Sequence, residues 1–412
     1  ARRGRAAGWP SMMSRWAAGP WRLFLACLCC GLPRAQAWMD FGHMEVAQIA
    51  YLEISDSERW HINKVLGYWE ISYPDMSDLV SSSVWADHIK CNQAHDGDKP
   101  GRTCLGMPAN ALNAFNRWHY TDLPYNPDKM SDVPTGPSIP SAVWALAEAI
   151  STFRYSQNSF SCNLMLRFAI HLVGDMHQPC HNVNLYSEGG RLGNFPFGDR
   201  GCTLFEVKKG KGPEGRAAGY WRNLHELWDE AAGLFGYEWP LSGEEKGELL
   251  RIAQEARNEL PRKAFPQYNA SDLVGCLETS CVEVFERWSR EAHELAVTEV
   301  YGHGITEGKH ESPSPEYLEN VKKVARRQVV LAGYRLADLL KVIAPELIMP
   351  RAPLGAQEDD TDSSKGDVPG FDTSKILLSA ACLLQSIAIA ALSLALCRMQ
   401  SKGSREIFLL QD

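Results

Sequence analysis

The sequence predicts an all-α fold, with a mainly helical domain followed by a C-terminal transmembrane helix. Apolar residues recur at helical spacing in eight segments, whereas few stretches alternate as strands do. Near the C-terminus, one predominantly apolar run is long enough to cross a bilayer. The chain has 412 residues, of which 45% are hydrophobic and 22% charged. This composition is typical of a globular protein, and the length accommodates one large domain or two ordinary ones.

The N-terminal segment, 1–37, has the pattern of a secretory signal peptide. A short apolar core at 23–32 follows two arginines, and the small-x-small triplet 35–37 forms a cleavage site directly before Trp38. Either methionine of the pair at 12–13 would begin a signal of ordinary length, so the residues before that pair, 1–11, are interpreted as an upstream artefact. The alternative interpretation of the apolar core is a buried helix.

Residues 38–349 are expected to form one domain without internal repeats. The helices predicted from apolar spacing are 41–54, 76–90, 138–156, 160–176, 217–232, 243–258, 282–300 and 318–344. The turn-rich connections are 93–109, 121–139, 187–215 and 303–316.

The C-terminal part of the chain is predicted to anchor this domain in a membrane. Residues 350–375 have the Pro, Gly, Ser and Asp content of a disordered stalk. Residues 376–397 form the apolar run, 22 residues long, which is expected to be the transmembrane helix. Basic residues in the tail, 398–412, place it in the cytosol. We therefore expect a type I membrane protein of the cell surface or an endomembrane compartment, with its large domain on the luminal or extracellular side.

The cysteines of the large domain fit an oxidising compartment. Seven cysteines lie in this domain, and the odd number leaves one of them free or intermolecular. The preferred disulfide pairs are Cys91 with Cys104 and Cys276 with Cys281. Asn269 begins an Asn-Ala-Ser acceptor for glycosylation, which fits a surface position on the luminal side.

The formal net charge of -8 argues against a nucleic-acid coat protein. Such proteins depend on many contacts between Lys or Arg and phosphate. A hydrolase must release its product, so the negative charge does not exclude an enzyme acting on nucleic acid, particularly where bound metal supplies positive charge.

Two His-x-x-x-Asp pairs, His171 with Asp175 and His225 with Asp229, are the strongest chemical signal. Residues four apart lie on the same face of a helix, so each pair can reach one metal ion. One such pair is more often a surface hydrogen bond, but both pairs here lie among apolar residues. Buried charged groups need a partner such as a metal. Imidazole and carboxylate ligands without thiolate favour zinc in a hydrolytic role.

The order of these and other residues resembles the class I nuclease family, the zinc-dependent nucleases of the mung bean type. The protozoan membrane-anchored 3′-nucleotidase/nucleases are the most similar branch. The matching elements are Trp38-x4-His43, Ser83-Val84-Trp85-Ala86-Asp87, Trp118-His119-Tyr120-x-Asp122, His171-x-x-Gly174-Asp175-x-x-Gln178-Pro179-x-His181 and Asn223-Leu224-His225-x-x-Trp228-Asp229. Together with the segment 332–337, they cover residues 38–344 in the family's order.

The resemblance implies a zinc-hydrolase fold of the phospholipase C/nuclease type with three Zn²⁺ per chain. The ligands it implies are Trp38 (through its α-amino nitrogen and carbonyl oxygen), His43 and Asp175 for one ion, Asp87, His119, His171 and the bridging Asp175 for a second, and His181, His225 and Asp229 for the third.

The resemblance also implies the reaction. The protein would hydrolyse single-stranded DNA or RNA to 5′-nucleotides and remove the 3′-phosphate from 3′-nucleotides, with no obligatory protein partner. Asp87 would orient or deprotonate the attacking water, and Lys90 would steady the charge on phosphate. Tyr120 would stack on a base and Asp122 would bind the base edge. His88 and His177 match no ligand position and are expected to be structural or solvent-facing.

One departure from the family's pattern concerns substrate recognition. The family has a Gly-Gly-Asn turn after the His181 element, where this chain has Gly201-Cys202-Thr203 and an insertion before it. Two alternatives to the nuclease stay open. A zinc phospholipase C shares the fold and the metal set, and a catalytically silent receptor could retain the fold to bind nucleic acid.

Overall fold

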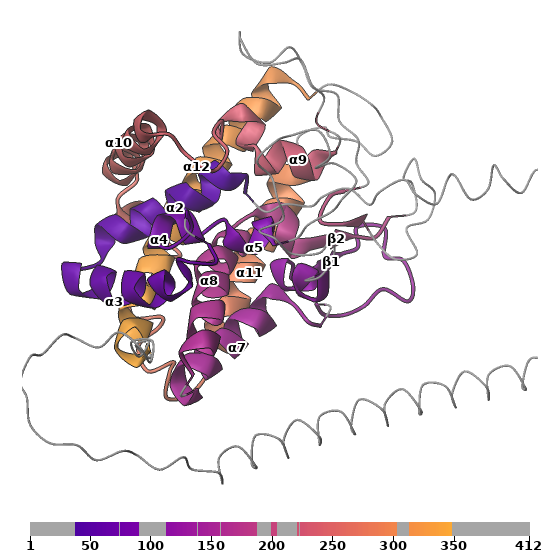
Figure 1. The fold of residues 1–412 in the computed structure, drawn as a ribbon. Coiled ribbons are helices and arrows are strands. Elements are labelled where there is room, and N and C mark those ends of the chain that lie inside the picture. The colour runs from indigo at the N-terminus through magenta and orange to yellow at the C-terminus, as the bar shows by residue number, and fades with distance from the viewer. Residues whose placement is uncertain are drawn as a thin grey trace, which may run out of the picture. The chain divides into compact units, whose positions relative to one another are not determined.

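The structure, a computed structural model, describes residues 38–73, 75–89, 113–137, 139–156, 158–187, 199–203, 221, 223–302 and 313–347. All of these residues belong to the first of two compact units of the chain, Ala1–Arg351. This described part is mainly helical, which confirms the predicted class of the large domain (Figure 1).

The elements follow one another as a succession of helices with short strands between them. The α-helices are α2 (Asp40–Glu53), α3 (Asp56–Leu66), α4 (Leu79–Ser82), α5 (Trp85–His88), α7 (Ala142–Tyr155), α8 (Ser159–Asp175), α9 (Leu224–Asp229), α10 (Gly243–Glu259), α11 (Val282–Leu295) and α12 (Pro315–Ile343). The 3₁₀ turns are η1 (Gly67–Trp69), η2 (Asn113–His119), η3 (Pro179–Asn182), η4 (Ala231–Gly233), η5 (Arg262–Ala264) and η7 (Ala344–Glu346), and η6 (Ala296–Val300) is a π-helical turn. The strands are β1 (Leu123–Tyr125), β2 (Val183–Leu185) and β3 (Asp199–Arg200).

Helix α8 runs through the core of the domain. Its N-cap is Asn158, whose side chain accepts hydrogen bonds from the backbone N–H groups of Phe160 and Ser161. Every residue from Met165 to Asp175 is buried, so this part of the helix has no solvent-facing side. A helix that is buried all round belongs to the centre of a large domain. Polar side chains on this stretch therefore need partners inside the protein.

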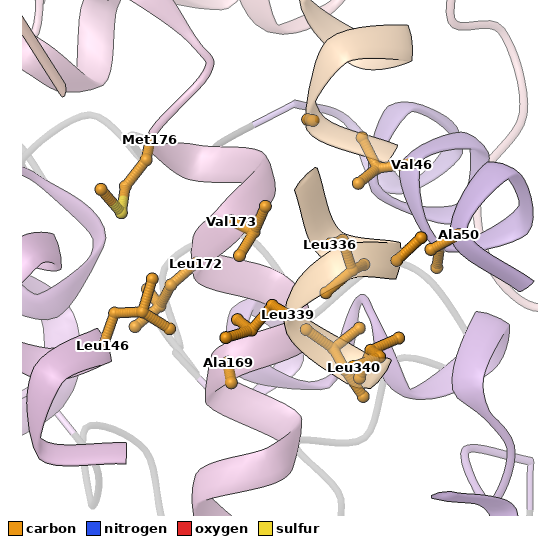
Figure 2. Packing of buried hydrophobic residues seen from close by; sticks show 14 of the residues in the cluster. Val46, Ala50, Leu146, Ala169, Leu172, Val173, Met176, Leu336, Leu339 and Leu340 are labelled. Carbon is orange, nitrogen blue, oxygen red and sulfur yellow. The ribbon is translucent and has the colours of Figure 1, made fainter. Parts of the chain in front are cut away.

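The core packs α8 between α7 on one side and α2 with α12 on the other (Figure 2). Leu172 of α8 lies beside Leu146 of α7, while Leu336 of α12 lies near Val46 of α2. Helices α2 and α12 approach closely at Gly333. A Cβ atom there would lie 2.5 Å from Cγ2 of Ile49, so a side chain at this position would force the two helices or Ile49 to shift.

A small mixed sheet holds the two segments that follow Tyr120 and His181. Strand β1 pairs in parallel with β2, from Leu123↔Val183 to Tyr125↔Leu185, and β2 pairs antiparallel with β3. Just before this pairing, the N–H of Thr121 donates to the carbonyl of His181 at 2.8 Å. The sheet thus fixes the residues around Tyr120 against η3.

The predicted helix 76–90 is wrong in one respect, because the structure divides it into α4 and α5. The break follows three consecutive serines, Ser81 to Ser83. The hydroxyls of Ser82 and Ser83 donate to the carbonyls of Leu79 and Val80. Such local side-chain bonds compete with helix continuation. Because of this break, α5 is a separate short helix, and it contacts α8.

The predicted membrane segment, 376–397, lies outside the described residues, as do the signal peptide and the stalk. Within the described part of the chain, no helix is both long and apolar enough to span a bilayer.

Candidate metal centre

His171 and Asp175, the first predicted pair, lie at the C-terminal end of α8 and are fully buried. Nε2 of His171 lies 3.3 Å from Oδ2 of Asp175. Nδ1 of His171 donates to the carbonyl of Ser83 at 2.6 Å. Because a carbonyl only accepts, this bond places the proton on Nδ1 and leaves Nε2 to face Asp175.

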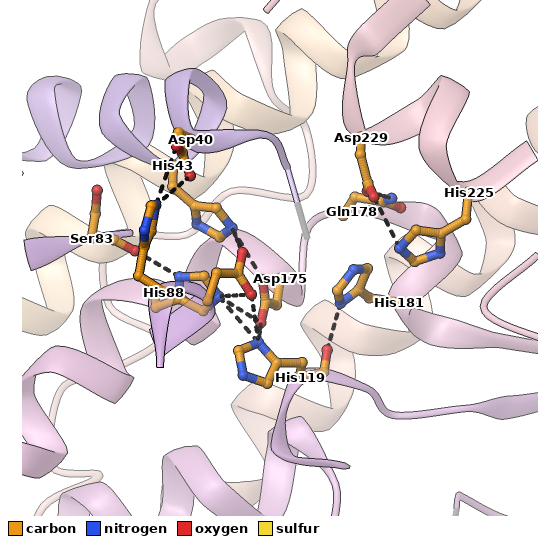
Figure 3. Close-up of polar contacts among 12 residues, drawn as sticks. Asp40, His43, Ser83, His88, His119, Asp175, Gln178, His181, His225 and Asp229 are labelled. Carbon is orange, nitrogen blue, oxygen red and sulfur yellow. Dashed lines mark hydrogen bonds and ion pairs between the residues drawn. The ribbon is translucent and has the colours of Figure 1, made fainter. Parts of the chain in front are cut away.

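Three further predicted ligands converge on this pair from three other segments (Figure 3). Nε2 of His43, from α2, lies 3.3 Å from Oδ1 of Asp175. Nδ1 of His119, at the end of η2, lies 2.8 Å from the other oxygen of Asp175. Oδ1 of Asp87, from α5, lies 3.6 Å from Nε2 of His171 and 3.7 Å from Nδ1 of His119. We call His43, Asp87, His119, His171 and Asp175 the first cluster.

The donor atoms of the first cluster fit a metal centre. Nε2 of His171 and Nδ1 of His119 are only 3.1 Å apart, and the rings of His43 and His171 stack with centroids 3.8 Å apart. Burial, followed by the neighbouring His171, lowers the pKa of His43 and favours its neutral form. Burial acts to raise the pKa of Asp175, but His171 and His119 outweigh it and hold the pKa well below its ordinary value. Neutral imidazole and ionised carboxylate are the forms that bind metals.

The second pair, His225 and Asp229, is also brought together, on α9, and His181 of η3 joins it. Nε2 of His225 lies 3.1 Å from Oδ2 of Asp229, and the rings of His181 and His225 have centroids 4.9 Å apart. Each of the three residues is at most 2% exposed. We call His181, His225 and Asp229 the second cluster. Its ligand atoms lie within 4.8 Å of one another, as in a metal site.

Backbone carbonyls orient both imidazoles of the second cluster. Nδ1 of His181 donates to the carbonyl of His119 at 2.6 Å, and Nδ1 of His225 donates to the carbonyl of Gly201. Each ring therefore keeps Nε2 for a ligand, which is the arrangement that metal-binding histidines favour. Burial raises the pKa of Asp229 to about 7. A cation beside this carboxylate would offset the cost of burying its charge.

Gln178 and Asn182 tie the two clusters to the turn that joins them. Nε2 of Gln178 donates to Oδ1 of Asp229 at 2.5 Å. The side-chain amide of Asn182 donates to the carbonyls of Met176 and Gln178, and its oxygen accepts from Ser289. No motif in the sequence predicts a role for Asn182. Its position directly after a histidine of the second cluster was the available signal.

Trp38, the predicted N-terminal ligand, is fully buried beside the first cluster. Its ring meets Phe235 edge to face at 5.5 Å. The backbone N–H of the next residue, Met39, donates to the carbonyl of Asp229 at 3.0 Å. The start of the described chain is therefore fixed near both clusters. Residue 37 and those before it lie outside the described residues, so the metal-binding role of the α-amino group stays a prediction.

The predicted base-binding residues, Tyr120 and Asp122, lie next to the second cluster. The ring of Tyr120 stacks on His181 with centroids 4.5 Å apart. Its hydroxyl is buried and has no hydrogen-bond partner within the described ranges. Asp122 is 9% exposed and has a φ of 53°. A left-handed backbone is costly for a non-glycine residue and is often found at functional sites.

The turn Gly201-Cys202-Thr203, predicted to stand where the family has Gly-Gly-Asn, lies directly against the second cluster. Gly201 and Cys202 both have left-handed backbones, with φ of 60° and 59°. A Cβ atom at Gly201 would lie 3.3 Å from Nδ1 of His225 and 3.3 Å from Cε1 of Tyr120. Gly201 therefore lies in close contact with both His225 and Tyr120, and a side chain at this position would press on them.

The remaining predicted residues have different outcomes. The disulfide between Cys276 and Cys281 is confirmed. Asn269 is exposed, as a glycosylation acceptor must be, and its modification stays a prediction. Lys90 and the pair Cys91 with Cys104 lie outside the described residues.

His177, which was expected to be structural or solvent-facing, is structural. It is 1% exposed. Its Nδ1 donates to the carbonyl of Val173, and its Nε2 accepts from the guanidinium of Arg335 at 2.9 Å. Burial and the charge of Arg335 lower its pKa well below the ordinary value, so the ring is neutral.

Asp40 and His88 form a contact that no pattern in the sequence predicts. Nε2 of His88 lies 3.2 Å from Oδ1 of Asp40. Burial acts to raise the pKa of Asp40, but His88 and the backbone N–H of Trp239 lower it below its ordinary value. The two residues are 48 positions apart, and no local pattern in the sequence joins them.

The fold and the clusters together define a class of protein. A mainly helical domain that gathers eight buried His and Asp side chains into metal-type clusters has the architecture of a metal-dependent hydrolase.

Comparison with known proteins identifies the family. The model of the S1/P1 Nuclease family matches residues 38–345. The chain belongs to the S1/P1 nuclease family, whose members are hydrolases acting on phosphodiester bonds, and the resemblance to the class I nucleases is confirmed.

Individual relatives are similar over nearly their whole length. Nuclease S1 of Aspergillus oryzae is 26% identical over 317 residues, which cover 75% of this chain and 92% of the relative. Nuclease P1 of Penicillium citrinum is 25% identical over 316 residues, which cover 74% of this chain and 97% of the relative. Endonuclease 2 of Arabidopsis thaliana is 23% identical over 338 residues, which cover 78% of this chain and 94% of the relative.

Proposed function

We propose that this protein is a three-zinc phosphoesterase that hydrolyses single-stranded DNA or RNA to 5′-nucleotides and removes the 3′-phosphate from 3′-nucleotides. The observation that carries the proposal is the pair of buried clusters, built from imidazoles and carboxylates alone. Thiolate-free donor sets of this kind suit zinc in hydrolysis. The names of the fungal and plant relatives support a nuclease in particular.

The proposed ligand sets divide the clusters among three ions. Trp38, His43 and Asp175 would hold one ion, Asp87, His119, His171 and Asp175 a second, and His181, His225 and Asp229 the third. Zinc held in this way would lower the pKa of coordinated water and would offer positive charge to the phosphate oxygens. The two oxygens of Asp175 face different partners, His43 and His119, which supports a bridging role.

The surrounding side chains would do the remaining work. The Asp87 carboxylate would orient the attacking water and accept its proton. Lys90, expected one turn further along the chain, would balance the charge that develops on phosphate. Tyr120 would stack on the base beside the departing 3′ oxygen, and Asp122 would accept hydrogen bonds from the base edge. Stacking tolerates any base, so we expect little sequence selectivity.

The proposed domain organisation follows from the sequence. Signal cleavage after Ala37 would release the α-amino group of Trp38, and the family match begins at this same residue. A stalk at 350–375, a membrane helix at 376–397 and a short tail at 398–412 would complete a type I membrane protein. The hydrolase domain would then act on the luminal or extracellular side.

Zinc content and activity of the purified protein test the proposal. We expect three zinc ions per chain, release of phosphate from adenosine 3′-monophosphate and cleavage of single-stranded DNA. Asp175→Asn should lower the zinc content and reduce turnover below about one hundredth, because it removes a bridging ligand rather than an outer partner worth 10- to 100-fold. Asp56→Asn, on a side chain that is 97% exposed, is the matched control. A zinc-loaded protein that cleaves neither substrate would contradict the proposal.

A further inference from the structure

Asp40 is a buried carboxylate close to the first cluster that the proposed chemistry does not use. It is the first residue of α2 and is 6% exposed. Nε2 of His88 lies 3.2 and 3.3 Å from its two oxygens, and the backbone N–H of Trp239 donates to it at 3.0 Å. Dashed lines in Figure 3 join His88 to Asp40. A carboxylate only accepts, so Nε2 of His88 is the donor in this bond.

The hydrogen bond joins two segments that carry proposed metal ligands. Asp40 lies two residues after Trp38 and three before His43, whereas His88 directly follows Asp87. These segments meet again at the centre, where Nε2 of His43 lies 4.0 Å from Oδ2 of Asp87. The bond between Asp40 and His88 is therefore a second, outer connection between the same two pieces of backbone.

Helix α5 needs such a connection because it is only four residues long. A helix of one turn has little stability of its own, so tertiary contacts must fix its position. Its first residue, Trp85, packs on Tyr73 and Phe168, with ring centroids 5.8 and 5.6 Å away. At its other end, His88 meets Asp40 and also the Trp239 ring, whose centroid is 5.1 Å away. Asp87 lies between these two anchors.

We propose that Asp40 and His88 are positioning residues that hold Asp87 at a set distance from Trp38 and His43, and thereby preorganise the first cluster for zinc. The proposal rests on the proposed function, since it deepens the description of the same centre. Neither side chain touches the reacting atoms. They act through the backbone of α5 and the first turn of α2. Trp239 completes the arrangement by bonding one partner and stacking edge to face on the other.

Two substitutions at His88 separate the hydrogen bond from the packing. His88→Phe keeps a ring against Trp239 but removes the donor. His88→Gln restores a donor, because the amide nitrogen of glutamine reaches about as far as Nε2 of histidine. The measurement is zinc occupancy at each site, read by anomalous diffraction from crystals of the full chain equilibrated at a series of buffered zinc concentrations. We expect His88→Phe to weaken zinc at the first cluster by about 10- to 100-fold, the range for outer partners of metal ligands.

The second cluster provides an internal reference for these variants. Zinc at His181, His225 and Asp229 should stay at its wild-type affinity in His88→Phe, and His88→Gln should recover most of the affinity at the first cluster. Tyr268→Phe removes a 2.6 Å hydrogen bond to Asp338, away from both clusters, and should change neither.

Two results would overturn the positioning role. One is wild-type zinc affinity at the first cluster in His88→Phe. The other is an equal loss at both clusters with no recovery in His88→Gln, which would indicate general destabilisation. Because zinc affinity is measured without substrate, a wild-type protein that binds zinc but cleaves nothing would contradict the proposed function alone. A wild-type chain that binds no zinc would overturn both.

Discussion

The ring of His43 fits beside α8 only because position 174 carries no side chain. A Cβ atom at Gly174 would lie 2.7 Å from Nδ1 of His43 and 2.9 Å from Cε1. Both atoms belong to a ring that is 1% exposed and stacked on His171, so the ring has little room to retreat. The glycine therefore sets the approach of α2 to α8 at the first cluster.

Gly174→Ala should consequently disturb metal binding more than folding. The displaced His43 ring loses its 3.3 Å approach to Asp175, and we expect zinc affinity at the first cluster and turnover to fall at least about tenfold. Zinc titration and the cleavage rate on single-stranded DNA measure the two effects. Gly67→Ala is the control, because a Cβ atom there meets nothing within 4 Å. Normal zinc binding and rate in Gly174→Ala would show that the ring can move without consequence.

Residue types at the site were predictable from the sequence, but their orientations were not. The structure places each His-x-x-x-Asp pair on one helix, as the spacing of four predicted. The carbonyls that orient the rings, those of Ser83, His119 and Gly201, come from segments distant in sequence. Backbone carbonyls are the same for every residue type, so no residue pattern identifies them.

At the scale of elements, the contact between α2 and α12 holds together the two ends of the described chain. Gly333 faces Ile49 across this contact, and its backbone approaches closely enough that a Cβ atom would lie 3.1 Å from the carbonyl of Val46 and within 2.6 Å of two side-chain atoms of Ile49. Overpacking of this kind forces backbone shifts, because protein interiors are already close-packed.

Gly333→Ala should therefore lower the free energy of unfolding by about 1–3 kcal/mol, the usual range for overpacking. Urea denaturation of the metal-free protein measures this change without a contribution from zinc. Gly247→Ala, in α10, has open space around the new methyl group. The control should be neutral or more stable by up to about 1 kcal/mol, the difference in helix propensity between glycine and alanine. An unchanged free energy for Gly333→Ala would mean that α12 shifts freely on α2.

The sequence predicted most long helices from apolar spacing, but it missed one helix of 11 residues and several short elements. Helix α3 was not predicted, although Ser55 and Glu58 form a capping box at its start. The strands are two or three residues long, too short for alternation to be recognised. The convergence of Asp87 and His119 on α8 was implied only by the family resemblance. Contacts between distant segments leave no local periodicity to detect.

At the scale of the whole domain, a group of ion pairs joins the helices α2, α10 and α12. Glu53, at the end of α2, accepts from Nε of Arg257 at 2.8 Å and from two nitrogens of Arg262 at 3.0 and 3.1 Å. Arg262 also donates to Asp338 of α12 at 2.9 Å. Burial acts to raise the pKa of Glu53, but the two arginines outweigh it and hold the pKa below the ordinary value of 4.5.

The sign of this pKa shift gives a stability that depends on pH. Because the folded pKa of Glu53 lies below its unfolded value, its contribution is complete above about pH 4.5 and is lost as the pH falls through the folded pKa. Glu53→Gln should cost about 1 kcal/mol at pH 7, a small value because the site is partly screened by solvent. The difference from wild type should shrink steadily below pH 4.5. Urea denaturation of the metal-free protein across this pH range measures this difference in the free energy of unfolding.

Glu259→Gln is the control, because Glu259 is an exposed side chain of α10 that pairs with Arg326. This variant should differ little from wild type at pH 7. If the difference in the free energy of unfolding between Glu53→Gln and wild type stays constant with pH, the side chain contributes through its packing and not through its charge.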